Sequence, residues 1–282
     1  MTEQMISGPS GELFTRVDGP EGAPWIVLSN SLGASSGMWR PQIDMLTGHY
    51  RVLRYDTRGH GRSATPPGDW SFDDLVADVI AVMDAHDVTR ADFLGLSLGG
   101  MTGLGVALRH PERLRRLVVA DARADAPEAF RENFLARLRK VEAGGIEAIA
   151  DATLETWFTE AWRQANPDEL AKVRAMILGT DPAGYVRCCH TLRTLDYLKD
   201  LGRITIPVLY LGGDRDAGAP PDVMHDMADA TPRGQFELIP DAAHVSNISN
   251  PHVFNCSVER FLTGAQEITQ PAHPAKFVPQ GT

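Results

Sequence analysis

The stretch Ala91-Asp-Phe-Leu-Gly-Leu-Ser-Leu-Gly-Gly100 decides the fold, because it joins an apolar run to a helical pattern through a serine set between two glycines. Small residues must flank Ser97 if a strand is to turn this sharply into a helix, and such a turn lifts the serine hydroxyl above the sheet edge. The stretch therefore predicts a strand over 91–96, a helix from Leu98 and a candidate nucleophile at Ser97.

Short β-rich runs alternate with helical patterns on both sides of this turn. The other runs expected as strands are 25–29, 50–56, 117–120, 207–211 and 235–239. Helical patterns are expected over 38–46, 71–86, 98–110 and 251–262, with Ser71 as the cap of the second. Strands that alternate with helices favour an α/β fold, a mostly parallel twisted sheet flanked by helices.

The alternation stops in the middle of the chain, where 124–201 has a helical pattern and no strand of comparable strength. We therefore expect one α/β core built from residues 1–123 and 202–264, with 124–201 inserted as a helical cap. Gln, Pro and small residues dominate 265–282, which predicts a flexible tail.

Composition excludes several classes of function. Twenty-seven Lys and Arg against 37 Asp and Glu give a net charge of −10, which disfavours nucleic acids and anionic membranes as partners. No apolar run approaches the roughly 20 residues of a membrane span, and the first residues lack the pattern of a secretory signal. The three cysteines fit neither a disulfide framework nor a zinc site. We expect a cytoplasmic protein without a metal, and the oligomeric state stays open.

A serine nucleophile requires a base, and the base requires an orienting acid. In this architecture the chain order is Ser, Asp, His, with the histidine after the last strand. His244 holds that place and is the predicted base, whereas His190 in the cap is a weaker candidate for the pocket. Asp216, after strand 207–211, is the predicted acid, with Asp214 and Asp121 as alternatives.

The reaction of an ester also develops negative charge on oxygen, which backbone N–H groups must meet. The amide of Leu98 at the start of the helix is one expected donor. Leu32, in the loop after strand 25–29, is the other. The donors belong to the main chain, so their apolar side chains are no obstacle.

Four segments together resemble the α/β-hydrolases and, more narrowly, the 3-oxoadipate enol-lactonases. These segments are Asn30-Ser-Leu-Gly33, Tyr55-Asp-Thr-Arg-Gly-His-Gly-Arg-Ser63, Gly95-Leu-Ser-Leu-Gly-Gly100 and Asp241-Ala-Ala-His-Val-Ser-Asn247. The resemblance extends over about residues 10–262. It implies a five-membered enol lactone with a carboxymethyl arm as substrate, attack by Ser97 with proton removal by His244, and no metal or organic cofactor.

The chain differs from that family just after Asp121, where Arg123-Ala-Asp-Ala-Pro127 stands at the expected pocket mouth. A substrate carboxylate would need a local cation, and the candidates are Arg123, Arg187 and Arg193. Trp157 is a candidate for the apolar wall of the pocket.

The predicted function is a serine hydrolase that opens a small lactone, of the 3-oxoadipate enol-lactone type, through an acyl-enzyme. One alternative is a broad carboxylesterase or lactonase. Others are a carbon–carbon bond hydrolase and a ligand receptor that keeps the hydrolase residues without turnover. Haloalkane dehalogenases and epoxide hydrolases are disfavoured, because they need an aspartate where this chain has Ser97.

Overall fold

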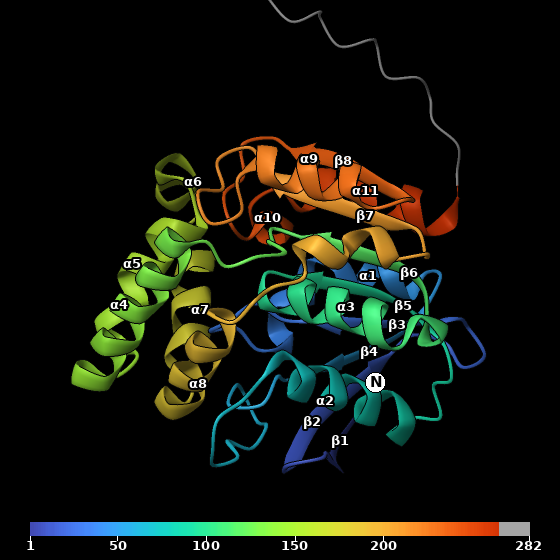
Figure 1. The fold of residues 1–282 in the computed structure, drawn as a ribbon, viewed down its shortest axis with the longest axis horizontal. Coiled ribbons are helices and arrows are strands. Elements are labelled where there is room, and N and C mark those ends of the chain that lie inside the picture. The colour runs from blue at the N-terminus through green and yellow to red at the C-terminus, as the bar shows by residue number, and fades with distance from the viewer. Residues whose placement is uncertain (265–282) are drawn as a thin grey trace, which may run out of the picture.

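Residues 1–264 are described by the computed structural model, so the predicted tail at 265–282 lies outside the described residues. Within them, one eight-stranded sheet runs through the molecule in the order β1-β2-β4-β3-β5-β6-β7-β8 (Figure 1). The strands are β1 (Thr2–Ser7), β2 (Glu12–Asp18), β3 (Trp25–Ser29), β4 (Arg51–Tyr55), β5 (Ala91–Leu96), β6 (Leu114–Ala120), β7 (Val208–Gly213) and β8 (Gly234–Ile239). Strands β4, β3 and β5 to β8 pair in parallel, whereas β1–β2 and β2–β4 are antiparallel. This confirms the predicted mostly parallel sheet.

The centre of the sheet is apolar on both faces. All six residues of β5 are buried, and its Leu94 pairs in register with Leu28 of β3 and Val118 of β6. Strands covered on both faces read as continuous apolar runs, which is why they could be located from the sequence. Neither β1 nor β2 was predicted. In β1, Ile6 is the one buried residue, and the strand depends on pairing with β2.

Helices cover both faces of this sheet. Helices α2 and α3 pack together on one face, and α1 packs with α11 on the other (Figure 1). The core helices are α1 (Arg40–Thr47), α2 (Phe72–Ala85), α3 (Leu98–Arg109), α9 (Pro221–Ala230), α10 (Ser246–Ser249) and α11 (Pro251–Thr263). The predicted cap of α2 is present, since the hydroxyl of Ser71 accepts from the amide of Asp74.

The segment between β6 and β7 is helical and gathers at one end of the sheet (Figure 1). Its α-helices are α4 (Glu128–Gly144), α5 (Glu147–Trp157), α6 (Glu160–Ala165), α7 (Pro167–Leu178) and α8 (Pro182–Leu192). The amide of Tyr197 donates to the carbonyl of Ala124 at 2.7 Å, so the two ends of the segment lie side by side. We call helices α4 to α8 the cap.

The cap rests directly on the loop that follows β4. A Cβ built on Gly59 would lie 2.5 Å from the Cα of Gly184, so the two backbones meet where only glycine fits. The hydroxyl of Thr191 donates to the carbonyl of Trp70 at 2.9 Å. None of the helices in residues 1–264 has the length and apolarity that a bilayer crossing demands.

Candidate active site

Ser97 occupies the sharp turn between β5 and α3. Its backbone has φ 54° and ψ −116°, a conformation that non-glycine residues rarely adopt. A Cβ on Gly95 would lie 2.2 Å from the carbonyl oxygen of Gly99, and one on Gly99 would lie 2.1 Å from the carbonyl oxygen of Ser29. The two glycines are therefore a steric requirement of the turn that presents the serine.

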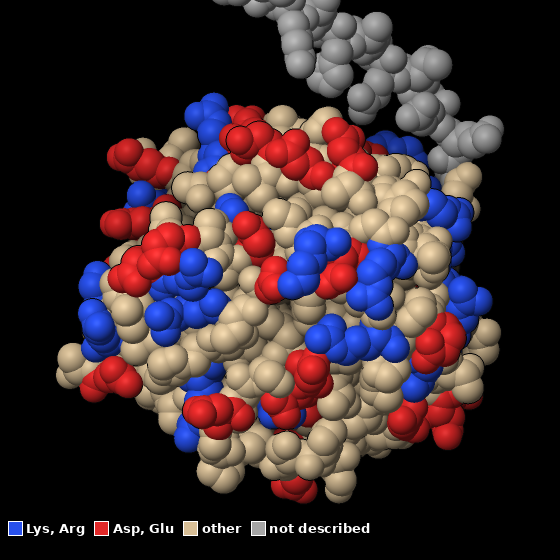
Figure 2. Space-filling model, viewed as in Figure 1, with Lys and Arg blue, Asp and Glu red and all other residues tan. Residues whose placement is uncertain are grey.

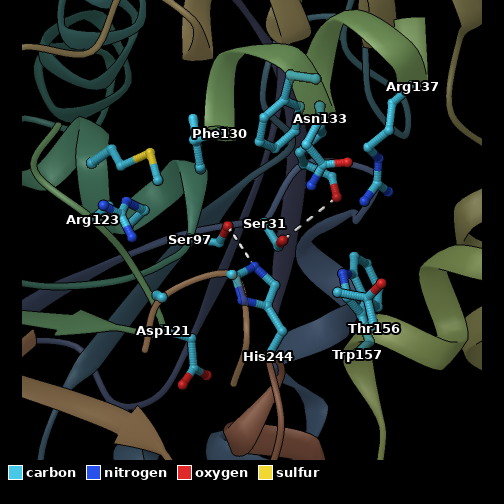
Figure 3. Close-up of a pocket in the computed structure, with 15 residues that line it drawn as sticks. Ser31, Ser97, Asp121, Arg123, Phe130, Asn133, Arg137, Thr156, Trp157 and His244 are labelled. Atoms are coloured by element: carbon cyan, nitrogen blue, oxygen red, sulfur yellow. Dashed lines mark hydrogen bonds between the residues drawn. The ribbon is translucent and has the colours of Figure 1, made fainter. Parts of the chain in front are cut away.

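The structure brings three of the predicted residues together at the carboxyl ends of the strands. His244 Nε2 lies 2.8 Å from the hydroxyl of Ser97 (Figure 3). On the other side of the ring, His244 Nδ1 lies 2.8 Å from Asp216 Oδ2. His244 follows β8 and Asp216 follows β7, so parallel neighbouring strands deliver both side chains to the same edge as Ser97.

The loop after β7 fixes the orientation of the Asp216 carboxylate. Its Oδ1 accepts hydrogen bonds from the amides of Gly218 at 2.7 Å and Ala219 at 3.1 Å. The other oxygen is thereby directed at His244 Nδ1, which donates its proton to it. This tautomer leaves Nε2 as an acceptor for the proton of Ser97.

Opposing forces set the pKa values of this pair. Burial lowers the pKa of His244, but the charge of Asp216 and the hydrogen bond to it outweigh burial and raise the pKa above its usual value. For Asp216, burial raises the pKa, whereas His244 and the amides of Gly218 and Ala219 lower it, and the net pKa is lowered. Asp216 is thus held as a carboxylate beside the ring.

The alternative acids have other partners. Asp121 is fully buried and accepts from the amide of Gly213 at 2.9 Å and from the hydroxyl of Ser246 at 2.7 Å. Burial, and then the charge of Asp216, raise the pKa of Asp121 to about 7. Asp214 accepts from the amide of Ala242 at 3.1 Å. Within the described residues, Asp216 is the acid hydrogen-bonded to His244.

Two backbone amides beside Ser97 have no hydrogen-bond acceptor among residues 1–264, those of Leu32 and Leu98. These are the donors predicted from the sequence. The neighbouring amide of Gly33 is occupied, since it donates to His60 Nε2 at 2.9 Å. Burial lowers the pKa of His60, which keeps that ring neutral and able to hold the loop in place.

A cavity of about 60 Å³ lies over Ser97, between the core and helices α4 and α5 of the cap (Figure 3). It is lined by Ser31, Leu32, Ser97, Met101, Asp121, Arg123, Phe130, Asn133, Phe134, Arg137, Thr156, Trp157, Gly218, Ala219 and His244. Of the predicted pocket residues, Arg123 and Trp157 are in this lining, whereas Arg187, Arg193 and His190 are not. Arg187 instead donates to the carbonyl of Gly68 at 2.9 Å.

The sequence analysis missed the contribution of helix α4. Phe130, Asn133 and Arg137 lie three and four residues apart, so they share one helix face, and all three line the cavity. This spacing was available in the sequence. The sequence does not show which face of this helix turns towards the cavity, so the same spacing could equally belong to an exposed helix.

Comparison with known proteins identifies the family of the chain. The profile of the alpha/beta hydrolase fold family matches residues 24–251. The chain belongs to the α/β-hydrolase fold family. Among the relatives of this α/β-hydrolase is 3-oxoadipate enol-lactonase 2 of Acinetobacter baylyi, 35% identical over 85% of this chain and 88% of that protein.

The crystal structure of the enol-lactonase from Burkholderia xenovorans LB400 superposes on this α/β-hydrolase with a TM-score of 0.89. The two are 38% identical over 92% of this chain and all of that one. A putative carbamate hydrolase, RutD of Agrobacterium fabrum, is 32% identical over 87% of this chain and 95% of its own length. The similarity to enol-lactonases inferred from the sequence motifs is confirmed.

The charges on the outer surface are mixed. Figure 2 shows basic and acidic side chains interspersed over the face in view, without a continuous basic area on that face. No group of three or more His, Cys, Asp or Glu side chains that could hold a metal ion occurs in the described part of the chain.

Proposed function

We propose that the protein is a serine hydrolase that opens a small lactone of the 3-oxoadipate enol-lactone type through an acyl-enzyme on Ser97. The observation that carries this proposal is the hydrogen-bonded chain from Ser97 through His244 to Asp216, with 2.8 Å at each step. A hydroxyl on a strained turn, a base that can accept its proton and a buried acid behind the base are the parts that nucleophilic acyl transfer requires.

In the first half of the reaction, the hydroxyl oxygen of Ser97 attacks the lactone carbonyl and its proton passes to His244 Nε2. The carbonyl oxygen becomes an oxyanion, for which the unoccupied amides of Leu32 and Leu98 are suitable donors. The imidazolium that forms is stabilised by the carboxylate of Asp216. When the tetrahedral intermediate collapses, the bond to the ring oxygen breaks and an enolate leaves, which takes its proton from His244 and becomes a ketone.

In the second half, His244 takes a proton from water, and the resulting hydroxide attacks the ester carbonyl on Ser97. Collapse of this second intermediate releases the carboxylic acid and returns the proton to the serine oxygen. These steps need no redox partner, and the absence of a cofactor stays a prediction. The prediction of a cytoplasmic location also stands as a proposal.

The choice of a lactone is supported by the enol-lactonases among the relatives and by the small cavity over the serine. A broad carboxylesterase or lactonase remains the nearest alternative, because the same three residues would cleave neutral esters. A carbamate substrate is a second alternative, supported by the RutD relative. Carbon–carbon bond hydrolysis and ligand binding without turnover are further outcomes that the same experiment separates.

The test is a substrate panel of enol lactones, saturated lactones, p-nitrophenyl esters, carbamates and dienone acids, with wild-type protein and with Ser97→Ala and His244→Ala. We expect the enol lactone to give the highest kcat/KM, and each substitution to lower kcat by at least about 10³-fold. Ser35→Ala, at a serine outside the cavity lining, is the matched control.

Trapping provides an independent readout of the nucleophile. A fluorophosphonate should add its mass to the peptide that contains Ser97, and this label should be absent from Ser97→Ala. Full activity in either the serine or the histidine variant would contradict the mechanism. If activity depends on Ser97 but neutral esters or carbamates are preferred, the proposed mechanism would stand and the proposed substrate would be wrong.

A further inference from the structure

Two arginines line the cavity over Ser97, and they differ in what compensates their charge. Arg123 and Arg137 lie on opposite sides of Ser97 and His244 in Figure 3. Since Asp121 is the one carboxylate in the cavity lining and its pKa is raised to about 7, the cavity carries an excess of positive charge. This excess stands against a chain whose net charge is −10.

Arg123 has an acidic partner. Its Nη2 lies 3.1 Å from Asp125 Oδ1, and its guanidinium lies over the ring of Phe130, 5.8 Å from the centroid. Its positive charge is therefore largely compensated before any ligand enters.

Arg137 has neutral partners. Its Nε donates to the hydroxyl of Tyr185 at 3.0 Å, and its Nη2 donates to the hydroxyl of Thr153 at 2.7 Å. No carboxylate among residues 1–264 lies within ion-pair distance of it, and its Nη1 has no hydrogen-bond partner there. Its guanidinium also lies over the ring of Phe134, 5.8 Å from the centroid, as that of Arg123 does over Phe130. What distinguishes Arg137 is therefore that, among residues 1–264, its partners from helices α4, α5 and α8 include no counter-ion.

A charge held in a partly buried site without a counter-ion costs free energy, so a site of this kind is completed by an anion. A guanidinium has a planar set of donors that matches a carboxylate. Arg137 also lies close enough to His244 for its charge to lower the pKa of that ring. A ligand carboxylate at Arg137 would therefore belong to the same small molecule whose carbonyl reaches Ser97.

We propose that Arg137 binds the carboxylate of the substrate and makes the enzyme selective for anionic lactones over neutral lactones and esters. This inference rests on the proposed function, and it assigns the role that the sequence analysis gave to Arg123, Arg187 or Arg193. Tyr185 and Thr153 are positioning residues, since they act through Arg137.

The test compares a γ-lactone that carries a carboxymethyl arm with its methyl ester, which differs in charge at one group. Arg137→Gln should lower kcat/KM for the acid by about 10- to 100-fold, the range for the loss of one charge-assisted hydrogen bond. At a pH above the acidic limb of both proteins, the loss on the methyl ester should be much smaller, because the ester presents no negative charge to Arg137. Arg123→Gln, the matched control in the same cavity, should change both substrates alike.

Two further variants separate charge from packing. Tyr185→Phe and Thr153→Val remove hydrogen bonds that position Arg137 and keep its charge, so each should reduce the preference for the acid by less than Arg137→Gln does. A binding readout without turnover is the Kd of the ring-opened acid for Ser97→Ala, which Arg137→Gln should weaken by a similar 10- to 100-fold.

An equal loss on acid and ester in Arg137→Gln would assign Arg137 to cap packing and overturn the proposal. So would a preference for the acid that disappears in Arg123→Gln and survives in Arg137→Gln. Equal hydrolysis of acid and ester by wild-type protein, abolished in Ser97→Ala, would overturn this proposal and leave the serine mechanism in place. Hydrolysis of neither would remove the proposed function itself.

Discussion

Replacing Asp216 by asparagine should disable the base without disturbing the loop that carries it. In the native loop, Oδ1 of Asp216 accepts from the amides of Gly218 and Ala219, and Oδ2 faces His244. An asparagine has one oxygen and one NH2 group for these two places. Its oxygen must occupy the first place, because an NH2 there would leave buried donors facing one another at a cost of about 1–3 kcal/mol for each unsatisfied group.

The NH2 of Asn at position 216 is then directed at His244 Nδ1 and donates to it. Nδ1 can accept only when its own proton is absent, so the neutral ring must carry its proton on Nε2. That nitrogen lies 2.8 Å from the hydroxyl of Ser97 and can no longer accept the serine proton. We therefore expect kcat to fall by about 10⁴-fold, as when the same change imposes the wrong tautomer in a Ser-His-Asp protease, which is about 5 kcal/mol of transition-state stabilisation.

The assay is lactone or ester hydrolysis at a pH above the acidic limb, with the melting temperature as a check on folding. Asp214→Asn is the neighbouring control and should keep kcat near the wild-type value. Asp121→Asn should lose far less activity than Asp216→Asn, because Asp121 has no hydrogen bond to His244 within the described residues. Activity of Asp216→Asn within about tenfold of wild type would refute this reasoning, as would an equal loss in Asp121→Asn.

Four other predictions concern pH and packing. A plot of kcat/KM against pH should fall on the acid side with an apparent pKa above that of an ordinary histidine, because protonated His244 cannot accept the serine proton; a limb at or below the ordinary value would contradict this. In the same titration, Arg137→Gln should move the limb to higher pH, since it removes a charge that lowers the pKa of His244. Asp121→Asn should move it to lower pH, since it removes a charge that raises that pKa. Gly99→Ala should reduce the free energy of unfolding in urea by about 3 kcal/mol, because the new Cβ would lie 2.1 Å from the carbonyl oxygen of Ser29; an unchanged denaturation midpoint would contradict this.

The parts of the fold that the sequence predicted are those governed by local chemistry. The turn at Ser97 needs glycines on both sides, and β5 needs apolar side chains on both faces, so both leave a strong pattern. Strand β1 leaves none, because five of its six residues are exposed and it exists through pairing with β2. The register between distant segments is a tertiary property that no local pattern encodes.

The residues of the candidate site also fall into those that the sequence could predict and those that it could not. The sequence placed His244 after the last strand and favoured Asp216 as the acid, but it left Asp214 and Asp121 as alternatives. In the structure, the amides of Gly218 and Ala219 orient the Asp216 carboxylate towards the His244 ring. This orientation depends on the conformation of the loop, which the residue types alone do not reveal. Arg137 was missed for a related reason, since its significance lies in neutral partners from two other helices.

The three acid–base groups behind Ser97 act as one electrostatic unit. Burial, and then the charge of the nearby Asp216, raise the pKa of Asp121 to about 7. The pair thereby avoids holding two full negative charges while the ring of His244 is neutral. In the proposed mechanism the ring takes the serine proton, and we expect its positive charge then to favour ionisation of Asp121, because the charge of His244 lowers the pKa of Asp121. In the proposed mechanism, Asp121 therefore helps to stabilise the imidazolium although it does not touch the ring, and we expect the pH dependence to belong to all three groups together.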